Sequence, residues 1–260
     1  LPRASRAAGG VMETVFLVVT TLCVGFVSGC TSVGGVLLIP ALLAWTDMDP
    51  RTVAGTMLLC FFLSGVYGTF LHYRAGRIDF REAMPMCLGA ALFGYAGAIT
   101  KQYVPVTTVS IMLGVAVILA GYFALRPVSR LGRMADAPAK TRNAGLFAVG
   151  AGVAFFCGMT GAGGPVLSVP IMLILGYPAL LAVAVARPVQ VVLTLSGSIA
   201  NLMVGAVDFK MALIMCGMLM TGVTVGTYCL RFFKPDFLKT LVSLLCIGTG
   251  IFMLVKNFMS

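Results

Sequence analysis

Residues 14–46 read TVFLVVTTLCVGFVSGCTSVGGVLLIPALLAWT and contain no Asp, Glu, Lys, Arg or His. As a continuous helix the segment would be roughly 50 Å long at 1.5 Å per residue, whereas one crossing of a bilayer takes about 20 apolar residues. It is too long for one crossing and too short for two. A hairpin of two short helices, joined at the glycine-containing stretch Thr31–Gly35, fits the segment best.

The composition extends this conclusion to the whole chain. Hydrophobic residues make up 60% of the sequence and charged residues 10%, whereas a soluble domain carries about a quarter charged residues. Further uncharged stretches lie at 52–71, 83–100, 102–125, 143–186, 188–207, 211–230 and 240–255. Lipid offers no hydrogen bonds to the backbone, so each stretch should be helical. The sequence therefore predicts an all-α polytopic membrane protein.

The chain also repeats itself. GFVSGCTSVGG at 25–35 recurs as AFFCGMTGAGG at 154–164, and GRIDF at 76–80 recurs as GAVDF at 205–209. Because the spacing between copies is nearly constant, we interpret the pattern as a duplication. We expect a first transmembrane repeat at 11–125, a basic linker loop at 126–142 and a second transmembrane repeat at 143–258.

Each repeat should consist of one glycine-broken hairpin followed by three transmembrane helices. The second hairpin is expected at about 143–175, and the six spans at 50–73, 82–100, 104–125, 178–204, 210–230 and 238–257. The length of the hairpin favours inverted repeats, a common plan in transporters. The distribution of Lys and Arg favours a parallel arrangement. We expect inverted repeats, and the parallel arrangement stays open.

The two glycine breaks are candidate substrate-binding elements. A helix that restarts after a break presents free N–H groups and the positive end of its dipole, and both suit an anion. Hydroxyl groups would add hydrogen-bond donors. The candidates at the two breaks are Thr31, Ser32, Gly34, Gly35, Thr160, Gly161, Gly163 and Gly164. The alternative is that these glycines only allow close packing between helices.

Arg187 is the most informative single residue, because it lies inside the apolar run 179–205. A charge at such depth is costly and usually faces a cavity or a partner. All eight acidic residues lie at expected span ends or in loops, so the guanidinium invites an anionic ligand whose oxygens match its planar fork. Gln190, three residues later, shares its helix face. The alternative is that Arg187 reaches toward an interface.

Two further polar residues, Thr56 and Asn201, lie on the spans that follow the hairpins and are the remaining ligand candidates. Hydrogen bonding between helices is the alternative for both. His72, the only histidine, lies at the end of an expected span beside Tyr73 and Arg74. We therefore expect it at the membrane interface.

Several classes of function are disfavoured. The eight cysteines lie in apolar stretches without a CxxC pair, which predicts neither a metal site nor a cofactor. GxSxG, HExxH and Walker motifs do not occur in the sequence, so we expect no enzymatic activity. The net charge of +10 is typical of the basic loops of membrane proteins, and no nucleic-acid partner is expected. The lack of interior carboxylates argues against a cation transporter.

The glycine-rich hairpins with following prolines, at Pro40 and Pro170, resemble those of the TauE/SafE sulfite exporter family. The stretch from Gly55-Thr56 to His72-Tyr73-Arg74-Ala75-Gly76-Arg77-Ile78-Asp79-Phe80 is similar as well. The resemblance runs from about residue 12 to 257. The chain has Val185-Ala186-Arg187 where the family tends to show Ala-Thr-Ser, and Asn201 at a position of histidine.

The resemblance implies an anion transporter of the bacterial inner membrane that exports sulfite, an organosulfonate or a related sulfur compound. Together with the residues above, it predicts a secondary transporter that binds its anion near the midplane, between the two glycine breaks. Its partners would be the small anionic substrate and the lipid bilayer, and a homodimer is left open. The alternatives are an anion channel and a membrane scaffold or sensor that transports nothing.

Overall fold

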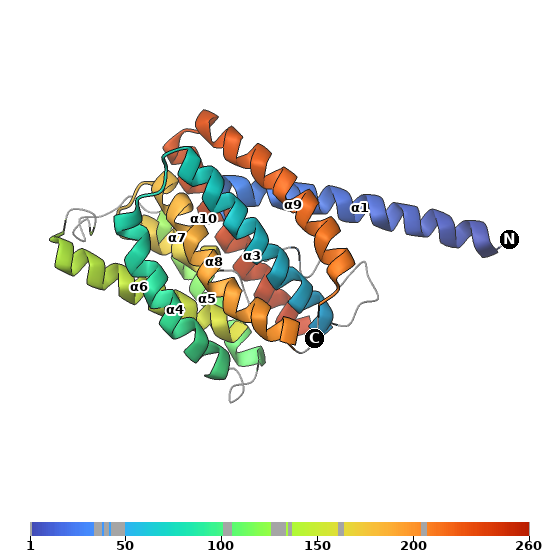
Figure 1. Ribbon diagram of the computed structural model, residues 1–260, viewed down its shortest axis with the longest axis horizontal. Helices are drawn as coiled ribbons and strands as arrows, with labels where there is room; N and C mark the ends of the chain where they lie inside the picture. The colour runs from blue at the N-terminus through green and yellow to red at the C-terminus, as the bar shows by residue number, and fades with distance from the viewer. Residues whose placement is uncertain are drawn as a thin grey trace.

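The computed structural model describes residues 2–33, 38, 42, 50–100, 106–125, 134, 137–160, 164–203 and 207–259, and every regular element in this part is helical (Figure 1). The helices are α1 (Pro2–Thr31), α3 (Pro50–Arg74), α4 (Phe80–Thr100), α5 (Val106–Leu125), α6 (Ala139–Thr160), α7 (Pro165–Ile174), α8 (Ala179–Met203), α9 (Phe209–Cys229), the 3₁₀ turn η3 (Leu230–Phe232) and α10 (Pro235–Met259).

The six predicted spans correspond to α3, α4, α5, α8, α9 and α10, with boundaries that differ by a few residues. Four described segments are long and apolar enough to cross a membrane, namely Gly55–Arg74, Ala139–Met159, Phe209–Phe232 and Pro235–Phe252. Three of them belong to predicted spans. The fourth is α6, which starts at Ala139, four residues before the second repeat was expected to begin.

The second predicted hairpin consists of α6 and α7, but only α7, with 10 residues, is short; α6 has 22 residues and is long enough to cross a membrane. The two helices are separated at Gly164, and the backbone N–H of Met134, before α6, donates to the carbonyl oxygen of Leu175, after α7, at 3.2 Å. The chain therefore returns to the side from which it entered. In the first hairpin α1 ends at Thr31, as predicted, and most of the residues that follow, Gly34 and Gly35 included, lie outside the described residues.

Side-chain contacts fix which helix ends lie together. Glu82 in the first turn of α4 contacts Arg142 in the first turn of α6 and Tyr177 just before α8. Arg77, after α3, donates to the carbonyl oxygen of Thr227 near the end of α9. We call this the Glu82 end: α3 and α9 finish there, and α4, α6 and α8 begin there. At the opposite end, the Asp208 end, the N–H of Asp208 before α9 donates to Thr56 near the start of α3.

Glycines bring helices of the two halves into backbone contact. A Cβ atom at Gly29 of α1 would lie 2.5 Å from the carbonyl oxygen of Val223 in α9. A Cβ at Gly150 of α6 would lie 2.2 Å from the carbonyl oxygen of Met86 in α4. Small residues at such seams are a typical means of packing helices in membranes. Packing is thus a demonstrated role of several glycines in this chain.

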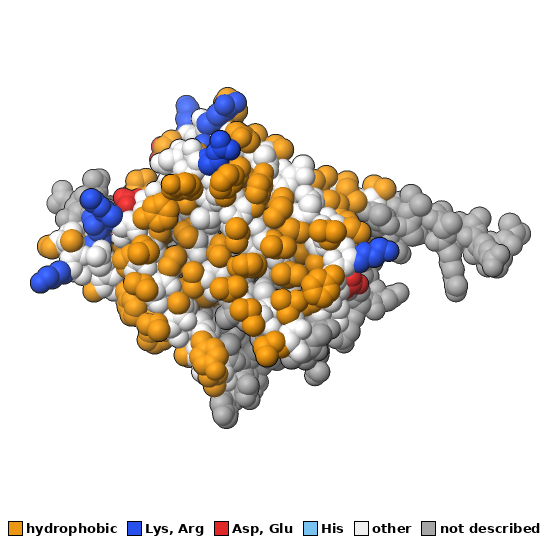
Figure 2. Space-filling view, viewed as in Figure 1, with side chains coloured by type: hydrophobic (Ala, Val, Ile, Leu, Met, Phe, Trp, Pro, Cys, Tyr) orange, Lys and Arg blue, Asp and Glu red, His pale blue; other side chains and the backbone are white. Residues whose placement is uncertain are grey.

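The outer surface is apolar over most of the helical bundle. Figure 2 shows hydrophobic side chains across the whole described face, with Lys and Arg side chains gathered at its edges. Large exposed side chains such as Leu92, Tyr95, Leu213 and Phe252 point outward from three different helices, α4, α9 and α10. A continuous apolar surface of this kind needs lipid as its solvent. The protein is an integral membrane protein.

Candidate functional site

Arg187 lies eight residues into α8, about 12 Å from the start of that helix at 1.5 Å per residue. Its side chain is fully buried. Nη2 donates to the carbonyl oxygen of Ser28, Nη1 lies 3.5 Å from Oε1 of Gln190, and Nε has no hydrogen-bond partner within the described structure. The predicted burial of this charge, and the shared face with Gln190, are confirmed.

The space for the guanidinium comes from α3. A Cβ atom at Gly68 would lie 3.2 Å from both Cδ and Nε of Arg187, so a larger residue would require the arginine side chain to shift. Three residues earlier, Gly65 packs against Gln190 and Val191 in the same way. The pairs run in opposite directions along the two helices, so α3 and α8 are antiparallel here. The next turn of α3 faces the Val183 turn of α8.

The end of α1 supplies the acceptor for Arg187. The carbonyl oxygen of Ser28, in the last turn of α1, accepts from Arg187 and also from the N–H of Ser32 at 2.7 Å. The C-terminal end of a helix carries partial negative charge, so α1 partly compensates the buried cation. The predicted anion-binding end is that of the helix that restarts after the break, and its first residues, Gly34 and Gly35 included, lie outside the described residues, so that prediction stays open.

The two hydroxyl groups predicted at this break are already engaged. Thr31 donates to the carbonyl oxygen of Val27 at 2.8 Å and accepts from the N–H of Val33. Ser32 donates to the carbonyl oxygen of Val183 at 3.0 Å and has a φ of 62°, a left-handed conformation that non-glycine residues seldom adopt. The Ser32 hydroxyl holds the end of α1 against α8, whereas the Thr31 hydroxyl forms hydrogen bonds only within the last turn of α1 and with Val33. Their role as ligands stays a prediction.

His72 is a residue that sequence reasoning placed wrongly. It was expected at the interface, but its side chain is fully buried, and neither ring nitrogen has a hydrogen-bond partner in the part of the chain that is described. It lies one turn beyond Gly68 on α3, so it shares the face that contacts Arg187. Buried polar atoms are nearly always hydrogen-bonded in native proteins. The spacing of Gly65, Gly68 and His72 along one helix face was the signal that could have revealed this.

The remaining candidates do not gather around Arg187. Thr56 accepts the N–H of Asp208 at 3.0 Å and lies twelve residues, about 18 Å, along α3 from Gly68. Gly164 lies just before α7 and faces Leu193, which is about 15 Å along α8 from Val183. The structure therefore does not bring Thr56 or Gly164 together with the Ser32 break. Gly161, Gly163 and the side chains of Thr160 and Asn201 lie outside what the structure describes.

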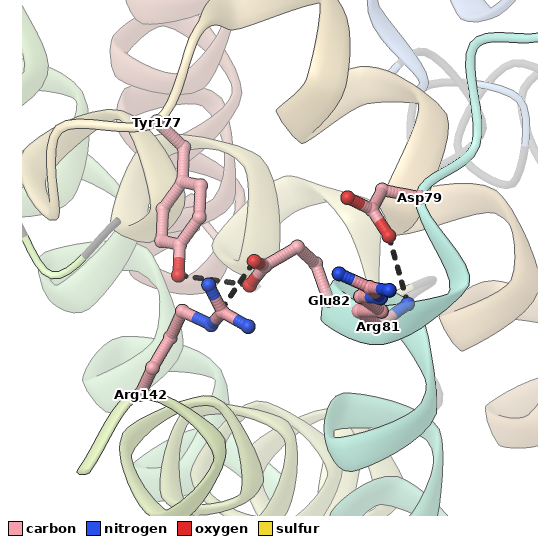
Figure 3. A network of polar contacts seen from close by, with 5 residues as sticks. All are labelled: Asp79, Arg81, Glu82, Arg142 and Tyr177. Atoms are coloured by element: carbon pink, nitrogen blue, oxygen red, sulfur yellow. Dashed lines mark hydrogen bonds and ion pairs between the residues drawn. The ribbon is translucent and has the colours of Figure 1, made fainter. Parts of the chain in front are cut away.

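A second polar cluster lies at the Glu82 end (Figure 3). The Tyr177 hydroxyl donates to Oε2 of Glu82 at 2.9 Å, and Nε of Arg142 lies 3.2 Å from Oε1 as an ion pair. Burial, and then the hydrogen bond to Glu82, raise the pKa of Tyr177 above its usual value. Oδ1 of Asp79 accepts the N–H of Arg81 at 2.9 Å. The cluster joins the starts of α4 and α6 to the turn before α8.

Metal-binding groups were searched in the described part of the chain, and no cluster of three or more His, Cys, Asp or Glu side chains occurs there. The eight cysteines are free thiols. Within the described structure, Nε of Arg187 remains a donor without a partner, which suits an anionic ligand.

The chain is similar to one protein family and to several individual membrane proteins. The family described as sulfite exporter TauE/SafE matches residues 15–253. The "probable membrane transporter protein MJ0441" of Methanocaldococcus jannaschii is 21% identical over 92% of this chain and 94% of its own length. No solved structure matches.

Two bacterial relatives match over shorter stretches. The "probable membrane transporter protein YunE" of Bacillus subtilis (strain 168) is 27% identical over 38% of this chain and 36% of its own length. The "probable membrane transporter protein ORF9" of Sinorhizobium sp. is 30% identical over 43% of both. The chain thus matches less than half of these two proteins. The family match covers most of the chain. The chain therefore belongs to the sulfite exporter TauE/SafE family, whose members are membrane transporters and not enzymes.

Proposed function

We propose that the chain is a secondary transporter that exports a small sulfur oxyanion or organosulfonate, bound beside Arg187. The observation that carries this proposal is a fully buried guanidinium whose acceptors are a carbonyl oxygen and a side-chain amide, not a carboxylate. A buried cation that has no anionic partner among the described residues favours an anionic ligand. The family name supports sulfite or a related compound as that ligand.

The substrate would contact the nitrogens that have no partner. Nε of Arg187 and the ring of His72 belong to the same region of the α3–α8 contact. A protonated ring nitrogen and the guanidinium would together offer donors to one oxyanion. The site would lie at the Ser32 break, about a third of the way along α8.

We further propose that the two halves are inverted repeats. The repeated motifs GRIDF and GAVDF are 129 positions apart. A Cβ at Gly97 of α4 would lie 2.2 Å from the carbonyl oxygen of Phe155 in α6, and a Cβ at Gly226 of α9 would lie 2.2 Å from that of Phe26 in α1. Each residue of the second contact is offset by 129 from its counterpart in the first. A two-fold axis maps each half onto the other, so a contact from the first half to the second must recur from the second half to the first. Such paired contacts are expected for halves related by a pseudo-two-fold axis.

The contact between α5 and α10 supports the same relation. Gly121 faces the carbonyl oxygen of Ser243, and Gly250 faces that of Gly114, again with an offset of 129. Since α4 begins at the Glu82 end and α9 finishes there, equivalent helices run in opposite directions. The axis would lie in the plane of the membrane, as in transporters that alternate access by moving one repeat against the other.

Substrate counterflow in proteoliposomes tests the function. Vesicles are preloaded with sulfite, thiosulfate, sulfoacetate or sulfate, and a trace of the labelled anion is added outside. A transient, saturable uptake with one or two of these anions is expected for a carrier. Flux that neither saturates nor shows counterflow would identify an anion channel. No flux with any of the four, in protein shown to be folded, would contradict the proposal.

A further inference from the structure

A groove opens on the surface between the first turns of α4 and α6, at the Glu82 end, with a volume of about 850 Å³. Its origin lies in the packing of the two helices. They touch through their backbones where Gly89 meets Phe147 and Gly150 meets Met86. Before this point, towards the Glu82 end, the helices carry larger side chains, and the groove lies between residues 80–88 of α4 and 139–147 of α6.

The lining of the groove changes with depth. The charged and polar lining residues, Arg81, Arg142 and Asn143, lie in the first two turns of their helices. Met84, Leu88 and Phe147 line the deeper part, up to about 12 Å further along the helix axes. The outward surface of α4 is apolar, with Met84, Leu88 and Leu92 exposed, so this groove faces the bilayer. A polar entrance above an apolar floor matches a phospholipid, whose headgroup lies above its acyl chains.

The charges at the entrance favour an anionic headgroup. Glu82 is buried, and its carboxylate is engaged by Arg142 and Tyr177. The carboxylate of Asp79 accepts the N–H of Arg81 and so caps α4 (Figure 3). The guanidinium of Arg81 is exposed and forms no ion pair with any described residue. Lys140 adds a second exposed cation in the first turn of α6.

We propose that this groove binds one anionic phospholipid of the bilayer. Arg81 holds the lipid phosphate with its planar fork, and Met84, Leu88 and Phe147 contact the acyl chains. Basic pockets between transmembrane helices on the cytoplasmic side are the usual sites for such headgroups. Because α4 and α6 belong to different halves of the chain, a bound lipid would contact both halves beside the Glu82–Arg142 ion pair.

Native mass spectrometry of the purified full chain tests this inference. Phosphatidylglycerol or phosphatidylethanolamine is added at equal concentration, and the fraction of protein with one bound lipid is measured. The wild type is expected to retain phosphatidylglycerol in preference to phosphatidylethanolamine. Arg81→Gln should lower this retention about fivefold, the change that corresponds to about 1 kcal/mol for one basic residue. Retention of phosphatidylethanolamine should fall less, because its ammonium group cancels the charge of its phosphate.

A matched control is Lys210→Gln, because Lys210 opens α9 at the opposite end just as Arg81 opens α4. It should retain phosphatidylglycerol like the wild type. A second variant, Leu88→Trp, fills the floor of the groove and should lower retention of both lipids. Equal loss of phosphatidylglycerol in the Arg81 and Lys210 variants, or no preference between the lipids in the wild type, would overturn the proposal.

Discussion

The acceptors of Arg187 are all dipoles. A carbonyl oxygen of Ser28, the amide oxygen of Gln190 and the C-terminal end of α1 surround the guanidinium, and within the described structure it forms no salt bridge. Dipoles repay only part of the cost of removing a cation from water. The residual positive charge is therefore available to a ligand, whose binding would recover part of that cost.

Replacement of Arg187 separates the roles of charge and shape. Arg187→Ala should abolish counterflow. Arg187→Lys keeps the charge but loses the planar fork, so flux at low substrate concentration should fall at least about tenfold, equivalent to about 1.4 kcal/mol. Thermal unfolding in detergent is the control for folding, and both variants should still unfold in one cooperative transition. Normal flux and affinity in Arg187→Ala would exclude a substrate role.

His72 provides a second residue-level prediction. His72→Phe keeps a ring of similar size without a hydrogen-bond donor, and should raise the KM for counterflow about tenfold, the effect of losing one charge-assisted hydrogen bond. His72→Asn restores a donor and is also the residue at the equivalent position of the second half, Asn201. It should retain more affinity than His72→Phe. An unchanged KM in both variants would leave His72 with a packing role only.

The sequence could reveal Arg187 but not His72, for a physical reason. A charge inside an apolar run is visible in one dimension, because no loop is near enough to hydrate it. His72 lies at the end of its own helix, where hydration is the default expectation. It is buried because α3 packs against α8 of the other half, through Gly65 and Gly68. That contact joins residues that are more than 100 positions apart in the sequence, and no local sequence pattern encodes it.

At the scale of elements, glycines in this chain have two distinct roles. Those within helices bring backbones into contact, as at Gly29, Gly150 and Gly226. Gly164 instead lies where α6 and α7 are separated. The sequence identified the break correctly, because two equivalent glycine-rich stretches recur. It did not identify the seams, since single glycines in a membrane helix are common and their partners lie on a distant helix.

The seam between α1 and α9 can be tested with a matched pair of glycines in one helix. A Cβ at Gly226 would lie 2.2 Å from the carbonyl oxygen of Phe26, whereas a Cβ at Gly217 would meet nothing within 4 Å. Alanine in a helix is favoured over glycine by about 1 kcal/mol. Gly217→Ala should therefore leave the melting temperature unchanged or raise it, whereas Gly226→Ala should lower it despite that gain. Equal effects of both changes would contradict the close contact.

The boundaries of most helices could be predicted from the sequence to within a few residues, because charged residues mark the ends of apolar runs. α6 is the clearest exception. Its first turns contain Lys140 and Arg142, which indicated a loop, yet the helix begins at Ala139. Arg142 is tolerated there because it pairs with Glu82. Residues 139–142, which were expected in the linker loop, are therefore helical.

At the scale of the whole molecule, the described basic side chains are unevenly distributed between the two ends. Those at the Glu82 end are Arg74, Arg77, Arg81, Lys140, Arg142, Arg231, Lys234 and Lys239, whereas Lys210 lies at the Asp208 end. The sequence alone left this distribution ambiguous, because the end to which each loop belongs depends on the path of the hairpins. Met134 and Leu175 show that the second hairpin returns to its own side, and this assigns the loops.

The positive-inside rule then predicts that the Glu82 end faces the cytoplasm. Reporter fusions in a bacterial host test this orientation. α10 runs away from the Glu82 end, so alkaline phosphatase fused after Met259 should be active and green fluorescent protein at the same site should be dark. Insertion of the same reporters after Ala137, just before α6, should give the reverse. The two reporters are active on opposite sides of the membrane, so each site should give one positive and one negative signal. A poorly expressed fusion, which gives no signal with either reporter, cannot mimic this result. Active phosphatase at Ala137 together with fluorescence after Met259 would reverse the orientation, and Arg81 and the lipid groove would then face the outer leaflet.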